Sequence, residues 1–153
     1  MKTPRDIAEQ PEPAKLPRRL AALCYDSLLL AALLFVFMLV LFMARGALGQ
    51  GPPGKLWLRI AAVVVAAVFY CGFWTHGGQT VGMRAWRIRL VSEDGGPVRW
   101  GAALVRFFAA CLSALLFGLG YWWSLVDRRR RTWHDLLAGT SMVHERREAS
   151  ARE

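Results

Sequence analysis

Three long apolar blocks constrain the fold of this chain more than any other feature of its sequence. The first, residues 20–44, contains one charged side chain, Asp26, and the second, residues 56–74, contains only Arg59. The third contains no charge over residues 107–126. At about 1.5 Å per helical residue the first block extends roughly 37 Å, more than the ~30 Å hydrocarbon core of a bilayer. A soluble domain of this size could not bury three such segments, because a core helix needs only one apolar face. The sequence therefore predicts an integral membrane protein.

The third apolar block, taken as residues 103–126, contains its own break. Gly118 and Gly120 divide it into two halves, each too short to cross a bilayer alone. If the block crossed completely, the Lys and Arg residues would divide into roughly ten on each side of the membrane. If it turned back, about seventeen of the 20 would lie on one face, which the positive-inside rule favours.

We therefore predict an all-α integral membrane protein with two transmembrane helices and a third hydrophobic re-entrant or interfacial helical hairpin. The alternative is three full spans. Non-helical backbone at membrane depth needs protein to cover it, so the hairpin should pack on the two spans. We expect a multi-pass protein of the cell's inner (plasma) membrane, with both the N-terminus and the C-terminus in the cytoplasm.

The chain divides into three regions. Residues 1–17, with several prolines among mixed charges, are typical of a disordered cytosolic tail. Residues 18–143 form the membrane domain, and residues 144–153 form a charged C-terminal tail.

A short extended segment is expected on the cytosolic side, between the second and third blocks. "AWRIRLV" alternates as a strand does, and "EDGGP" predicts a hairpin turn after it. Trp86, Ile88 and Leu90 share one side of this segment. We expect that side to lie against the membrane surface.

The net charge of +9 and the pI near 10.5 would by themselves suggest a nucleic-acid partner. The arginines, however, gather at the ends of the apolar blocks, where cytoplasmic retention and attraction to anionic lipid explain them. We interpret the cluster after the third block as a lipid-headgroup anchor worth about 1 kcal/mol per arginine. We expect membrane lipid as a partner and no nucleic acid. The cluster consists of Arg128, Arg129, Arg130 and Arg131.

Asp26 is an expensive residue for a membrane helix, since an Asp at the bilayer centre costs about 2.5–3.5 kcal/mol. Membrane carboxylates usually face a bundle interior or a wet cavity and have a partner there. Arg19 lies two helical turns earlier, roughly 10.5 Å along the same face, which is long for a direct ion pair. We interpret Arg19 and Asp26 as one polar stripe, each facing a group from elsewhere in the fold or from a second subunit. This stripe fixes helix packing, takes part in transport, or has no role beyond reaching the membrane interface.

Asp135 lies in a segment that begins polar and ends apolar, "DRRRRTWHDLLAGTSMV". Thr132 is a predicted N-cap, which places Asp135 in the first turn of a helix, where negative charge is favourable. Asp135 is then either a simple helix-start charge or an ion-pair partner of Arg19 or of an arginine in the middle segment.

Sites of enzymatic chemistry are not visible in the sequence. Ser27 and Ser113 have no adjacent His, and His76 has no Cys or second His near it. "GGQTVG" lacks the Gly-Lys-Ser/Thr ending of a phosphate-binding loop. The three cysteines lie inside apolar blocks, as small buried hydrophobic residues do. We therefore expect no enzyme activity, no cofactor and no metal.

Three segments together resemble one known family. "RRLAALCYD" opens the first span, "GGQTVGMRAWRIRLV" follows the second and "RTWHDLLAGTSMV" lies near the end. They look like the RDD family of small membrane domains, which is named for one arginine and two aspartates. The resemblance covers roughly residues 17–143 and implies Arg19, Asp26 and Asp135 as the family's polar network. One departure is Met83, where members often carry Lys.

The resemblance implies transport of ions or small solutes, with cation/proton exchange proposed for some family members. Two or three short hydrophobic elements cannot enclose a pathway alone, so transport would require a homo-oligomer. The alternative function is a non-transporting membrane adaptor or assembly subunit that holds a protein partner. In that case the network of Arg and Asp is structural.

Overall fold

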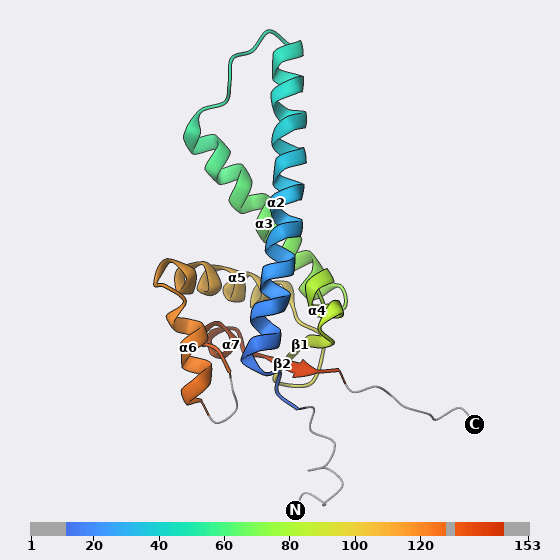
Figure 1. Ribbon diagram of the computed structural model, residues 1–153, viewed down its shortest axis with the longest axis vertical. Coiled ribbons are helices and arrows are strands. Elements are labelled where there is room, and N and C mark those ends of the chain that lie inside the picture. Colours follow the sequence, from blue (N-terminus) through green and yellow to red (C-terminus); the bar gives the residue numbers. More distant parts are fainter. Residues whose placement is uncertain (1–11, 128–130, 146–153) are drawn as a thin grey trace, which may run out of the picture.

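Figure 1 shows a computed structural model of the protein, which describes residues 12–127 and 131–145. Two long helices form a hairpin that projects from a base made of shorter elements (Figure 1). In chain order the elements are α2 Leu16–Ala47, α3 Lys55–Thr75, α4 Val81–Ala85, β1 Ile88–Ser92, α5 Trp100–Leu115, α6 Leu119–Val126, α7 Trp133–Ala138 and β2 Thr140–His144.

Helices α2 and α3 are each long and apolar enough to cross a membrane, which confirms the expectation of two apolar helices of that length. Pro17 lies in the first turn of α2, where its missing N–H costs nothing. Burial along α2 is confined to its first third, at Arg19, Ala22 and Asp26. Along α3 it is confined to the last turns, at Cys71 and Trp74. The far ends of both helices therefore expose apolar side chains, as lipid-facing helices do.

The base contains a two-stranded antiparallel sheet, so the prediction of an all-α fold was incomplete. Strand β1 pairs with β2, with Ile88 opposite His144 and Ser92 opposite Thr140. "AWRIRLV" does contain a strand, but the turn that follows it does not lead into a partner strand. The hairpin expected there was therefore wrong, because the strand's partner comes from the far end of the chain.

The N-terminal segment before α2 also belongs to the base. Pro13 forms a β-bridge with Val143, and Ala14 is only 2% exposed. The predicted tail over residues 1–17 therefore ends too late, since the packed structure includes residues 12–17; residues 1–11 lie outside the described part. At the other end, the charged tail predicted from residue 144 begins with a strand residue, and residues 146–153 lie outside the described part.

The core of the base is small and is built from short apolar side chains and two aromatic rings. Ile88 and Leu90 are buried in it, whereas Trp86 is exposed. The expectation that all three lie against the membrane surface was wrong for the two aliphatic residues, which pack inside. The buried hydrophobic residues are Ala14, Ala22, Cys71, Trp74, Met83, Ile88, Leu90, Val98, Ala103 and Phe107.

Helices α5 and α6 form a pair that bends by 100° at a short break. The chain turns at Phe117 and Gly118, which have φ values of 55° and 75°; the second is a conformation that glycine adopts without strain. Gly120 lies inside α6, where its N–H donates to Ser113 Oγ on α5 at 3.0 Å. In Figure 1, α5 runs across the base of the long hairpin and α6 turns away from the hairpin's tip.

Candidate functional site

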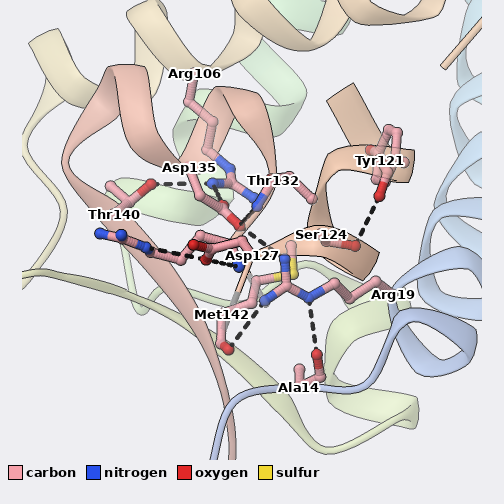
Figure 2. A network of polar contacts seen from close by, with 11 residues as sticks. Ala14, Arg19, Arg106, Tyr121, Ser124, Asp127, Thr132, Asp135, Thr140 and Met142 are labelled. Atoms are coloured by element: carbon pink, nitrogen blue, oxygen red, sulfur yellow. Dashed lines mark hydrogen bonds and ion pairs between the residues drawn. The ribbon is translucent and has the colours of Figure 1, made fainter. Parts of the chain in front are cut away.

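A buried carboxylate, Asp135, joins two arginines at the centre of the base (Figure 2). Nη1 of Arg19 donates to Asp135 Oδ2 at 2.7 Å, and Nη1 of Arg106 donates to Oδ1. The backbone N–H of Thr132 also donates to Oδ2, at 2.9 Å, which closes the first turn of α7. The three charged side chains are no more than 2% exposed. We call Arg19, Arg106 and Asp135 the charge triad.

The triad connects most elements of the base. Arg19 also donates from Nε to the Ala14 carbonyl at 3.0 Å and from Nη2 to the Met142 carbonyl at 3.4 Å. Arg106 also donates from Nη1 to Thr140 Oγ1 at 3.0 Å. The N-terminal segment, α2, α5, α7 and β2 are therefore tied to one carboxylate, as Figure 2 shows.

Burial and the charges of the triad together set the pKa values of Asp135 and of the adjacent His134. Burial alone would raise the pKa of Asp135, but the adjacent Arg106 and Arg19 hold that pKa well below its usual range. Burial, reinforced by the positive charge of Arg106, lowers the pKa of His134 to about 3. At neutral pH Asp135 is therefore an anion and His134 is a neutral imidazole.

Asp26 has a different environment, formed by neutral groups. Its Oδ2 accepts a hydrogen bond from Thr80 Oγ1 at 2.5 Å, and its Oδ1 accepts one from the Gly82 N–H at 2.8 Å. Thr80 Oγ1 also accepts from the Met83 N–H at 3.2 Å, which caps α4. Among residues 12–127 and 131–145, no ion pair includes Asp26.

Gly82 lets α4 approach α2 at this point. A Cβ at this position would lie 2.9 Å from the Asp26 carboxylate and would also overlap the Ala22 carbonyl oxygen. Any side chain would therefore separate the two helices and lengthen the hydrogen bond from Gly82 to Asp26. The glycine is a geometric requirement of the Asp26 site.

A cavity of about 230 Å³ lies between the two sites. Arg19, Asp26, Arg106 and His134 contribute to its wall, and the rest of the lining is mainly apolar. Met83, the one departure from the family pattern identified in the sequence, is buried on the same wall. Within the described residues, no group of three or more His, Cys, Asp or Glu side chains is placed to hold a metal ion.

The structure brings together Arg19 and Asp135 and keeps Asp26 apart, bonded to α4 and the residue that caps it. Sequence reasoning missed Arg106, although it was the one charged residue in the block 103–126 and so carried a usable signal. It also missed the role of Thr80 and Gly82, which lie in the "GGQTVG" stretch that contributes to the family resemblance.

Only one residue of the proposed lipid-anchoring cluster lies in the described part of the chain. Arg131 donates to Glu93 Oε1 at 2.9 Å and to Asp127 Oδ2 at 3.4 Å. Arg128, Arg129 and Arg130 lie outside the described residues.

Comparison with known proteins identifies a family. The model of the RDD family matches residues 13–139, a range that contains both Asp26 and all three residues of the charge triad. No curated protein and no solved structure matches the chain.

Proposed function

Since this chain belongs to the RDD family, we propose that it is a membrane protein in which Asp26 binds a small cation or a proton and passes it across the bilayer. The observation that supports this is the contrast between the two buried aspartates. Asp135 is neutralised by two arginines, whereas Asp26 lines a cavity and, among the described residues, has only a hydroxyl and an amide N–H as hydrogen-bond partners.

A buried carboxylate without a counter-charge is unstable in a low-dielectric surrounding. It lowers its free energy by taking up a proton or by coordinating a cation, and the two compete for the same oxygens. The hydrogen bonds from Thr80 and Gly82 stabilise the ionised carboxylate of Asp26 when no ion is bound, so the bound proton or cation can leave again. This alternation is what cation/proton exchange requires of a single side chain.

The pathway itself requires more than one copy of the chain. The two long helices diverge toward their far ends in Figure 1, and their side chains there are exposed to the surroundings. Two helices cannot enclose a water-filled route, so we propose a homo-oligomer in which the exposed halves of α2 and α3 pack against other copies.

We further propose that α5 and α6 enter and leave the membrane region from the same side. The support is that segments before and after this pair contact each other: β1 pairs with β2, and Glu93 forms an ion pair with Arg131. Pro13 also pairs with Val143, so the two ends of the described chain lie on one side. With about seventeen of the 20 Lys and Arg residues there, the positive-inside rule assigns that side to the cytoplasm.

Flux through reconstituted protein tests the transport proposal. Purified protein in liposomes should exchange Na⁺ or K⁺ for protons when a gradient of that cation is imposed. The proton movement is measured with a pH-sensitive dye inside the vesicles. Asp26→Asn should abolish the exchange. The matched control is Glu93→Gln, which makes the same chemical change at an exposed carboxylate and should leave the flux unchanged. Wild-type protein that moves neither ion, or Asp26→Asn protein that exchanges normally, would falsify the proposal.

A second candidate is an adaptor or assembly subunit of the membrane, with a protein partner. It is supported by the completeness of the charge triad, whose carboxylate has bonds on both oxygens and links elements from both ends of the chain. If this candidate is right, the wild-type protein shows only background flux and Asp26→Asn does not change it. A protein that co-purifies with the wild type would be lost from the Asp26→Asn variant.

A further inference from the structure

Three residues on the cavity wall have buried hydrogen-bonding atoms that the protein leaves unpaired. Within the described residues, Trp74 Nε1, Arg106 Nε and His134 Nδ1 are buried without a hydrogen-bond partner, and all three residues line the cavity. Buried polar groups in folded proteins are almost always paired. The Arg106 guanidinium carbon lies 5.2 Å from the centre of the Trp74 ring, so the two side chains form one corner of the cavity wall.

The chemistry of this corner specifies the group that would complete it. An indole N–H and a guanidinium Nε–H can only donate, so the missing partner is an acceptor. The charge triad has two positive charges and one negative charge, and His134 is neutral because burial and Arg106 lower its pKa to about 3. Asp26 on the same wall balances the remaining positive charge, so the two donors specify the acceptor. Guanidinium groups bind carboxylates especially well, which favours an anionic acceptor.

The rest of the wall specifies what the acceptor is attached to. Leu23, Phe107, Ala110, Ala114 and Met142 present hydrocarbon or thioether surface to the cavity. From this pairing of an apolar chamber with unpaired donors, we propose that the cavity binds an amphipathic carboxylate, an apolar chain ending in a carboxyl group, with that group bonded to Trp74 and Arg106. This binding is a second use of the cavity, beside the proposed ion exchange at Asp26 on the same wall.

Asp26 makes the site testable by charge as well as by hydrogen bonding. It is the acidic residue on the cavity wall, and among the described residues it forms no ion pair. Its negative charge repels a carboxylate in the same cavity. Asp26→Asn should therefore bind the ligand at least as tightly as the wild type, whereas the same change should abolish ion exchange.

Native mass spectrometry of the detergent-solubilised protein provides the direct test, with decanoate, decanol and acetate as probes. We expect one decanoate per chain, with decanol bound about tenfold more weakly because it lacks the charge-assisted hydrogen bonds. Acetate should not bind, because it lacks the chain. Equal retention of decanoate and decanol would show that only the apolar wall matters, and binding of acetate would show a simple anion site. Absence of decanoate binding would show that water fills the corner. Each of these results would overturn the proposal.

Trp74→Phe removes the indole N–H and keeps an aromatic ring, and Trp57→Phe makes the same change at an exposed position of the same helix. We expect Trp74→Phe to weaken decanoate binding about tenfold and Trp57→Phe to leave it unchanged. Equal binding by the two variants would contradict the assigned hydrogen bond.

If Trp74→Phe fails to fold, Cys111 provides a measurement on the native cavity. Cys111 lines the cavity and is accessible, whereas Cys71 is fully buried. In a Cys24→Ser background, decanoate should slow alkylation of Cys111 severalfold and decanol should not. Equal rates with and without decanoate would also reject the site. Loss of flux with intact decanoate binding would reject only the proposed ion exchange.

Discussion

The guanidinium of Arg19 and the carboxylate of Asp135 meet at 2.7 Å although 116 positions separate them in the chain. Both side chains are buried, and the same carboxylate also accepts from Arg106. Three buried charges therefore depend on each other for neutralisation. Removal of the single negative charge leaves two buried arginines without compensation, which is the most damaging change that the site allows.

Asp135→Asn should destabilise the protein strongly. The amide keeps the shape of the side chain but cannot neutralise Arg19 and Arg106, and loss of one partner from a buried ion pair costs about 3–5 kcal/mol. We expect a clear fall in the temperature of thermal unfolding in detergent. Glu93→Gln is the control, because its ion pair with Arg131 involves a side chain that is 50% exposed. Its effect should stay within about 0.5 kcal/mol. Similar shifts for the two variants would show that the triad does not stabilise the base.

His134 should make stability depend on pH in the acid range. Burial lowers its pKa to about 3 in the folded protein from the usual histidine value of about 6.5, so between these values the unfolded chain binds more protons. Stability should fall as the pH drops from 6.5 toward 3, with a slope of up to about 1.4 kcal/mol per pH unit from this residue.

The pKa of Asp135 is also lowered, but its contribution is lost only as the pH falls below about 4, the value expected for an unfolded Asp. The unfolding temperature of His134→Gln should therefore change less with pH between 6.5 and 4.5 than that of the wild type. His76→Gln, a change at an exposed position, should keep the wild-type slope. A His134→Gln curve parallel to the wild type would contradict the assignment of a neutral buried imidazole.

Gly82→Ala should disturb the Asp26 site. The new methyl group would lie 2.9 Å from the carboxylate and would overlap the Ala22 carbonyl, so α4 must move away from α2. We expect lower thermal stability and lower ion exchange together. Gly72→Ala is the matched control: Gly72 lies inside α3 with no atom within 4 Å of the added carbon. This control should retain exchange and gain up to about 1 kcal/mol of stability from the lower backbone entropy of the unfolded state.

Cysteine labelling tests the proposed path of α5 and α6. In a Cys24→Ser, Cys111→Ser background, an impermeant maleimide should label Gly51→Cys in intact cells. It should label Asp94→Cys and Glu145→Cys only after permeabilisation. All three positions are exposed in the structure. If α5 and α6 together crossed the membrane, Asp94→Cys and Glu145→Cys would react from opposite sides.

The features that could be predicted from the sequence were those that depend on residues close together in the chain. Blocks 20–44 and 56–74 fall inside α2 and α3 because length and hydropathy are sufficient to specify an apolar helix. The break in the third block falls at Gly118 for a local reason, a backbone conformation that favours glycine. The pairing of β1 with β2 could not be predicted in the same way, because strand partners far apart in sequence leave no periodic signal near either strand.

The sequence predicted several residues of the site but fewer of the contacts between them. A charged residue in an apolar block signals a buried partner, and this argument identified Arg19 and Asp26 as residues that need one. It did not show that Asp26 would be bonded by Thr80 and Gly82, since a hydroxyl and a backbone N–H are common groups without a distinctive pattern. Arg106 obeyed the same rule as Asp26 and was overlooked because it lies near the start of its block.

The distance along the chain between Arg19 and Asp135 has a consequence for synthesis in the cell. Arg19 leaves the ribosome 116 residues before the carboxylate that neutralises it, an interval of roughly 6 to 23 s at typical translation rates. During this time the guanidinium of Arg19 lacks its carboxylate and must be solvated by water or by lipid phosphates instead. Maturation therefore ends with the last strand to be made, and a nascent chain halted before residue 135 would be a natural target for quality-control proteases.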